Sequence, residues 1–99
     1  MECLTFTYPA EKEVSKSSHV GVVGSGNLEV LMEPSVSGQA EAEVTTSLDG
    51  NREIWNCVLE RFFQENPVAV HLEINDFGAT PGVVRLRLLQ ALELAEEVE

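Results

Sequence analysis

Ser25 is the residue of this chain that is best suited to chemistry, because it stands between Gly24 and Gly26. Glycine has no Cβ and adopts positive φ readily, so a Gly-Ser-Gly turn presents one hydroxyl without bulky neighbours and lets a large group approach it. An uncrowded hydroxyl of this kind suits the covalent attachment of a group. Glycine and serine are also common in hairpin turns, so the tripeptide alone favours a purely structural turn.

Ser25 could instead be the nucleophile of a small serine hydrolase. A hydrolase needs a base near the serine and an acid behind that base, and the chain offers His19 or His71 with Asp76 or Asp49. Ser25, His71 and Asp76 form the set considered for this alternative. The expected position of Ser25 between two strands differs from the strand-to-helix turn of the usual hydrolase motif, which counts against it. An interaction module that is never modified is a third alternative.

The spacing of the histidines and cysteines indicates no metal site and no disulfide framework. His19 and His71 are far apart in the sequence, and neither has a carboxylate beside it at helical spacing, so both are expected to be ordinary strand residues. Cys3 and Cys57 lie in a candidate strand and a candidate helix. Both thiols are therefore expected to stay reduced and inert.

The stretch from Asp76 to Gly82 has the composition of a tight connection between a strand and a helix. Thr80 is a suitable N-cap, and Pro81 fits the first turn of the helix. The amides at such a helix start could also hold a phosphate or a carboxylate of a partner. Because such helix starts are common, a plain connection is the favoured interpretation.

The size and charge of the chain limit the classes of function it can have. Its 99 residues suffice for a single domain, residues 1–99, with one modest core. Lys and Arg number 6 and Asp and Glu 17, so the net charge is −11, which makes nucleic acids and anionic membranes poor partners. The chain has neither an apolar run of the ~20 residues that span a bilayer nor a basic start followed by an apolar segment. We therefore expect a cytoplasmic protein.

The elements that must position these residues follow from the period of the apolar side chains. Period-two alternation predicts strands at 3–8, 20–23, 28–32, 40–46 and 68–75. The tip of the hairpin between the second and third strands is Gly24 to Asn27. Helical spacing predicts a helix whose apolar stripe is Ile54, Trp55, Val58, Leu59, Phe62 and Phe63, and a second whose stripe is Val84, Leu88, Leu92 and Ala95. Residues 10–18 show no period and are expected to form a solvated connection.

Each predicted strand has one polar face, and each predicted helix has one apolar stripe. This pattern predicts an α+β fold, a two-layer α/β sandwich in which two helices cover one face of a mostly antiparallel sheet of about five strands. The strand at 40–46 is expected to be a third consecutive antiparallel strand. It could also form a crossover, through the first helix, to a parallel strand at 68–75. The order of the strands is left open.

Three segments together resemble one family of proteins. They are VVGSGNLEVL at 22–31, VTTS at 44–47 and DFGATPGVVRLR at 76–87. In this order and in a chain of this length they look like the acyl carrier (delta) subunit of malonate decarboxylase, and the resemblance runs over nearly the whole chain. The chain is more distantly similar to the acyl carrier subunit of citrate lyase.

The resemblance implies a carrier that catalyses no step itself. A phosphoribosyl-dephospho-CoA group would be attached to Ser25 through a phosphodiester by a dedicated transferase, the holo-carrier synthase, and its thiol would hold acetyl and malonyl thioesters. The implied partners are the acetyl/malonyl transferase subunit, the decarboxylase subunits, which release carbon dioxide, and a malonyl transferase. Gly24 and Gly26 would support the turn that carries the attachment site.

Overall fold

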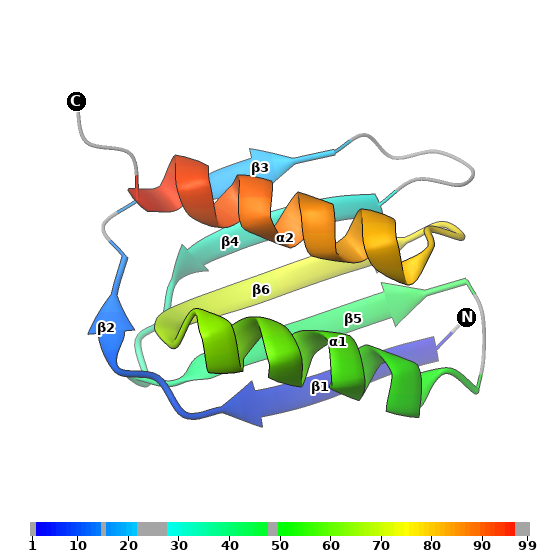
Figure 1. Ribbon diagram of the computed structural model, residues 1–99, viewed down its shortest axis with the longest axis horizontal. Helices are drawn as coiled ribbons and strands as arrows, with labels where there is room; N and C mark the ends of the chain where they lie inside the picture. Colours follow the sequence, from blue (N-terminus) through cyan, green and yellow to red (C-terminus); the bar gives the residue numbers. More distant parts are fainter. Residues whose placement is uncertain (1, 15, 22–27, 48–49, 97–99) are drawn as a thin grey trace.

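The computed structural model describes residues 2–14, 16–21, 28–47 and 50–96. Over these ranges the chain forms a six-stranded sheet and two helices that lie on one face of it (Figure 1). The elements are β1 (Glu2–Tyr8), β2 (Lys12–Glu13), β3 (Ser18–Val20), β4 (Leu28–Pro34), β5 (Ala40–Thr46), α1 (Arg52–Glu65), β6 (Val68–Asp76) and α2 (Pro81–Glu96). The predicted two-layer α+β architecture is confirmed.

The sheet has the strand order β1-β5-β6-β4-β3, and β2 pairs separately with β6. The β1/β5, β4/β6 and β3/β4 pairs are antiparallel, whereas β5/β6 and β2/β6 are parallel. The expected parallel arrangement of the strands on either side of α1 is therefore confirmed. Both helices begin at the end of the sheet where β6 finishes, and they run in the same general direction (Figure 1).

The strand at 40–46 is not the neighbour of the strand that precedes it in the chain, and this expectation was wrong. β6 lies between β4 and β5 and pairs with both of them. The reason is the composition of β6, because its side chains at alternate positions are all buried: Val68, Val70, Leu72 and Ile74. A strand with so many apolar side chains buries the most apolar surface when it lies at the centre of the sheet.

The connection at 10–18 contains more structure than its sequence predicts. Lys12 and Glu13 form β2 beside the start of β6, and the amides of Glu11 and Lys12 donate to the carbonyl of Pro67 at 2.8 and 3.2 Å. Val14 is buried in the main core. A two-residue strand is too short to show a period, so alternation could not reveal it.

The core lies between the sheet and the two helices. In α2 the predicted stripe of Val84, Leu88, Leu92 and Ala95 is buried. In α1 the aromatic part of the stripe is buried, but Ile54 remains 51% exposed, so its assignment to the core was wrong. Neither described helix is long and apolar enough to cross a membrane.

Candidate functional site

Ser25 lies, with Gly24 and Gly26, in the segment 22–27, which is outside the described residues. The residues on either side of this segment locate its attachment to the fold. β3 and β4 are antiparallel partners with Val20 opposite Val30, so the predicted antiparallel pairing is confirmed. β3 covers Ser18–Val20 rather than the predicted 20–23, and the predicted tip stays a prediction because 22–27 are outside the described residues. β3 is the edge strand at one side of the main strand order.

Gly21 closes the base of this hairpin. Its φ is +98°, and a Cβ placed on it would collide with the carbonyl oxygen of Leu28. Only glycine fits so close to another backbone, because every other L-residue has a Cβ. Gly21 and Leu28 are therefore in direct backbone contact, and the six residues between them start and end at one point of the sheet.

A hydrogen-bonded chain of side chains from three strands lies beside the base of the hairpin. His19 Nε2 is 2.9 Å from Glu29 Oε2, and Asn75 Nδ2 donates to Glu29 Oε1 at 2.8 Å. The three residues come from β3, β4 and β6, and they lie on the face of the sheet opposite the helices. Both oxygens of Glu29 are thus occupied, and the group links β3 and β4 to the centre of the sheet. The predicted placement of His19 in a strand is confirmed, but its partners come from other strands and were not predicted.

Asp76 lies on the helix side of the same end of the sheet, opposite Leu28 in the β4/β6 register. Its Oδ1 accepts from the amides of Gly78 and Ala79 at 3.2 and 2.9 Å, and its Oδ2 accepts from the Thr46 hydroxyl at 2.8 Å. The carboxylate therefore holds the connection between β6 and α2. The favoured interpretation of 76–82 as a tight connection agrees with these contacts.

Thr80 caps α2 as predicted. The amide of Val83 donates to Thr80 Oγ1 at 3.4 Å, and the amide of Val84 donates to the Thr80 carbonyl at 3.0 Å. Two of the amides at the helix start are therefore already paired. At the start of α1, by contrast, the side chain of the N-cap residue Asn51 makes no capping hydrogen bond.

The histidine and aspartate of the hydrolase alternative do not meet. His71 and Asp76 are both in β6, but successive side chains of a strand alternate, so His71 is on the open face and Asp76 on the helix face. The two residues are also five positions apart in the strand, which is about 16 Å along β6. The ring nitrogens of His71 lie 3.5 Å from Glu41 and 3.4 Å from Glu43 instead. Ser25 and Asp49 are outside the described residues.

Metal and disulfide chemistry find no support in the part of the chain that the structure describes. In it, no group of three or more His, Cys, Asp and Glu side chains is arranged to hold a metal ion. Cys3 in β1 and Cys57 in α1 are free and exposed. Their predicted placement in a strand and a helix is confirmed.

A cleft of about 190 Å³ lies between the N-terminal halves of the two helices, at the end of the sheet where the segment 22–27 is attached. We call it the interhelical cleft. It is lined by Asn51, Ile54, Trp55, Val58, Asp76, Ala79 and Val84. Two of these residues are polar, Asn51 and Asp76, and the others are apolar. The Asp76 carboxylate already accepts three hydrogen bonds from the protein.

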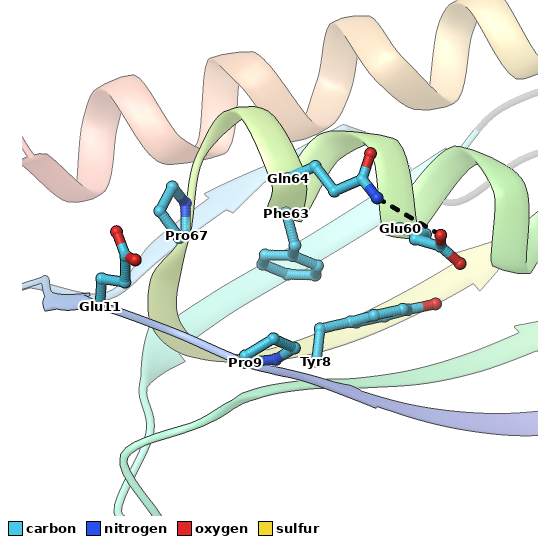
Figure 2. Close-up of a pocket in the computed structure, with 7 residues that line it drawn as sticks. All are labelled: Tyr8, Pro9, Glu11, Glu60, Phe63, Gln64 and Pro67. Carbon is cyan, nitrogen blue, oxygen red and sulfur yellow. Dashed lines mark hydrogen bonds between the residues drawn. The ribbon is translucent and has the colours of Figure 1, made fainter.

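A larger pocket of about 390 Å³ lies at the opposite end of the sheet (Figure 2). It is lined by Tyr8, Pro9, Glu11, Glu60, Phe63, Gln64 and Pro67. The Tyr8 ring stacks on Phe63, with centroids 5.4 Å apart, and its hydroxyl donates to Asn56 Oδ1 at 2.8 Å. Burial and the nearby charge of Glu60 raise the pKa of Tyr8 to about 12. β6 begins here, whereas Leu28 is paired with the last residue of β6, so this pocket is remote from Leu28.

Comparison with known proteins gives one consistent family. Residues 15–95 match the family described as malonate decarboxylase delta subunit, an acyl carrier protein. The chain is 50% identical, over 99% of its length and 100% of the relative's, to a malonate decarboxylase acyl carrier protein from Azotobacter vinelandii. A second such protein, from Stutzerimonas stutzeri, is 50% identical over 94% of this chain and 95% of its own.

A solved structure shares the fold and much of the sequence. One chain in the crystal structure of a Pseudomonas malonate decarboxylase hetero-tetramer in complex with malonate superposes with a TM-score of 0.90 and 47% identity. The match covers 96% of this chain and 99% of that one. From the family match, the relatives and the shared fold together, the chain belongs to the malonate decarboxylase delta subunit family, whose members are acyl carrier subunits rather than catalytic ones.

Proposed function

We propose that this protein carries acetyl and malonyl groups as thioesters on a phosphoribosyl-dephospho-CoA arm attached to Ser25 through a phosphodiester. The observation that carries the proposal is the contact between Gly21 and Leu28. Gly21 and Leu28 stand at the two ends of the six-residue segment that contains Gly-Ser-Gly, and β3, which precedes this segment, is an edge strand of the sheet. A serine between two glycines, as Ser25 is in the sequence, has no Cβ-bearing neighbour to crowd its hydroxyl.

The described residues fit a passive carrier. When attached, the arm supplies the thiol that holds the acyl group, and the chain supplies a rigid support for the arm. The His19, Glu29 and Asn75 group and the Asp76 carboxylate hold the hairpin base and the β6–α2 connection on opposite faces of the sheet. The two residues proposed for acid and base catalysis, His71 and Asp76, lie on opposite faces of β6, so the hydrolase alternative loses its catalytic pair.

The partners follow from the steps that the chain does not catalyse. A holo-carrier synthase attaches the arm, a malonyl transferase and the acetyl/malonyl transferase subunit load malonyl in place of acetyl, and the decarboxylase subunits release carbon dioxide and leave acetyl on the arm. The similar chain in the Pseudomonas hetero-tetramer supports an assembly with other subunits. We place the cycle in the cytoplasm, because the exposed thiols of Cys3 and Cys57 and the thiol of the arm all need a reducing compartment.

The test is the intact mass of the protein isolated from a host that makes the attaching enzymes. The wild-type mass should exceed the sequence mass by that of the arm, and Ser25→Ala should show the sequence mass alone. Ser37→Ala is the matched control, because Ser37 is an exposed serine that, like Ser25, is followed in the sequence by a glycine, and this variant should be modified normally.

Two outcomes would contradict the proposal. A mass increase that survives Ser25→Ala would place the arm on another residue. An unmodified wild-type protein from an active complex, with activity retained in Ser25→Ala, would favour the alternative of an interaction module that is never modified.

A further inference from the structure

The interhelical cleft has the shape and chemistry of a site for a small apolar group. Trp55 and Val84 are 5% and 3% exposed and are part of its lining, whereas Ile54 is 51% exposed although it lines the same cleft. A volume of about 190 Å³ is below the ~300 Å³ at which pockets for drug-sized ligands begin, so it suits the end of a chain rather than a nucleotide.

The cleft lies within reach of a group attached to Ser25. Asp76 lines the cleft and is the register partner of Leu28, and both side chains are on the helix face. Ser25 is three residues from Leu28, and three residues span at most about 11 Å. The pantetheine part of a CoA arm has as many chain atoms as about four residues and spans about 13 Å, and the nucleotide part adds to this. The arm is therefore long enough to fold back to the cleft.

The lining also matches the chemistry of a pantetheine thioester. Its apolar side chains suit the methyl group of an acetyl thioester and the methylene groups beside the sulfur. The side chain of Asn51 also lines the cleft, and it makes no capping hydrogen bond to α1. Its amide group can donate to and accept from the amides of pantetheine. The Asp76 carboxylate is engaged with Thr46, Gly78 and Ala79, so it does not repel the arm as an unpaired charge would.

From these observations we propose that the interhelical cleft holds the acylated end of the arm between visits to the catalytic subunits. This inference rests on the proposed attachment at Ser25. Its consequence is protection of the thioester, which water otherwise cleaves by adding its oxygen to the acyl carbon while the carbon–sulfur bond breaks and the thiol takes a proton. The same contact shields the free thiol of the arm from reagents.

Trp55 is the single tryptophan of the chain, so its fluorescence reports on the cleft. The first measurement uses the Ser25→Ala protein, which cannot carry the arm, and titrates it with S-acetylpantetheine. We expect a saturable change in Trp55 emission that Ile54→Gln weakens by about fourfold, the factor that one lost buried methylene is worth. Leu86→Gln is the matched control, because Leu86 is a 54% exposed helix residue outside the cleft, and it should titrate like the parent.

The second measurement uses the modified protein in a Cys3→Ser, Cys57→Ser background, because both exposed thiols would react with an alkylating reagent. The rate of alkylation of the arm thiol by iodoacetamide should be several-fold lower than that of free pantetheine. Ile54→Gln, which weakens the apolar lining, and Ala79→Leu, which fills the cleft, should each raise the rate, whereas Leu86→Gln should leave it unchanged.

The outcomes separate the two proposals. If the wild-type mass increases but neither Trp55 emission nor the alkylation rate responds to Ile54→Gln and Ala79→Leu, the cleft proposal is wrong and the carrier function stands. If no mass increase occurs but S-acetylpantetheine still binds beside Trp55, attachment at Ser25 is wrong and the cleft remains a pantetheine site.

Discussion

Gly21 shows how a single missing side chain shapes the attachment region. Its positive φ and its contact with the Leu28 carbonyl are two separate demands for glycine. Gly38 has a positive φ of +77°, but an added Cβ would meet no atom within 4 Å beyond its chain neighbours. At Gly38, therefore, only the backbone conformation favours glycine. Replacing each of these two glycines in turn separates the free-energy cost of the positive φ from the free-energy cost of the collision with the Leu28 carbonyl.

Gly21→Ala should lower the free energy of unfolding by more than about 2 kcal/mol, because the left-handed conformation costs about 1 kcal/mol and an unrelieved clash adds about 1–3 kcal/mol. Gly38→Ala should lose only about 1 kcal/mol. Denaturant unfolding measures both values. Equal losses in the two variants would show that Gly21 and Leu28 are not in close contact in solution.

Tyr8 should titrate abnormally, and it is the single tyrosine of the chain, so absorbance reports on it alone. Its pKa is raised from 10.0 to about 12 by burial and by the charge of Glu60. The stabilisation linked to this shift is complete below pH 10 and is lost as the pH rises from 10 toward 12, because the unfolded chain releases this proton first.

Ultraviolet titration of the folded protein should therefore give a midpoint near 12, and the same titration in denaturant a midpoint near 10. The stability advantage of the wild type over Tyr8→Phe should shrink over this range. A folded midpoint near that of the denatured protein would mean that the Tyr8 ring is not held against Phe63.

At the level of residues, the sequence predicted which element a residue lies in better than it predicted the hydrogen-bond partners of that residue. The capping role of Thr80 was confirmed, whereas the assignment of Ser25 and its two glycines stays a prediction. The link from His19 through Glu29 to Asn75 joins three strands, so no local pattern could show it. Ile54 was misassigned because the predicted stripe of α1 was wider than the face that the sheet covers.

Among the elements, the connection between β6 and α2 depends on one carboxylate. Asp76 accepts three hydrogen bonds, two from the amides of Gly78 and Ala79 and one from Thr46. Gly78 itself has a φ of +99°, which lets the chain turn sharply after the strand. The start of α2, and with it one wall of the interhelical cleft, is therefore set by this aspartate.

Asp76→Ala should lower the free energy of unfolding by about 2–3 kcal/mol, since hydrogen bonds to a charged group are worth about 1.5–3 kcal/mol each and water recovers part of the loss. Thr46→Val removes one of the three bonds and should cost about 1 kcal/mol. Thermal unfolding tests the ranking. A smaller loss for Asp76→Ala than for Thr46→Val would contradict the role assigned to the aspartate.

The elements themselves were largely predictable, because β4, β5 and β6 and the buried side of α2 carry clear periods over at least seven residues each. β2 was not, since its two residues are held by the carbonyl of Pro67 and by the start of β6, which are distant in the sequence. Local pattern identifies an element when its own side chains decide the structure, and it fails when a remote partner does.

On the scale of the whole molecule, the net charge is −11, and the face of the sheet opposite the helices carries the carboxylates of Glu41, Glu43 and Glu73. Glu43 and Glu73 are register partners there, on adjacent strands. Their neighbour His71 lies between Glu41 and Glu43. Like charges in register on one face of a sheet repel, so this face stores a modest instability.

Glu73→Gln should therefore raise the free energy of unfolding by about 0.5 kcal/mol at low salt, and the gain should shrink as salt is added. Glu53→Gln changes the net charge equally, but Glu53 lies in the first turn of α1, where a negative charge is favourable, so this variant should be neutral or destabilised. Salt-dependent thermal unfolding of both distinguishes local repulsion from net charge. Equal shifts in the two variants would refute the local explanation.

The two-layer arrangement could be predicted because every strand and helix has one face to bury, and this requirement holds however the strands are ordered. The order itself depends on which strand is most apolar. β6 takes the centre and separates β4 from β5, although those two are consecutive in the chain. That competition is decided by the whole sheet, so no single segment reveals it.

The central position of β6 also sets the timing of folding during synthesis. Its residues leave the ribosome after five of the other strands and α1, yet they pair with β5, β4 and β2. Until then no strand joins the β3/β4 pair to the β1/β5 pair, and the apolar side chains that pack beside β6 stay in contact with water. The nascent chain must therefore wait for its last third before the sheet can close, and these long-range pairings make that closure slow.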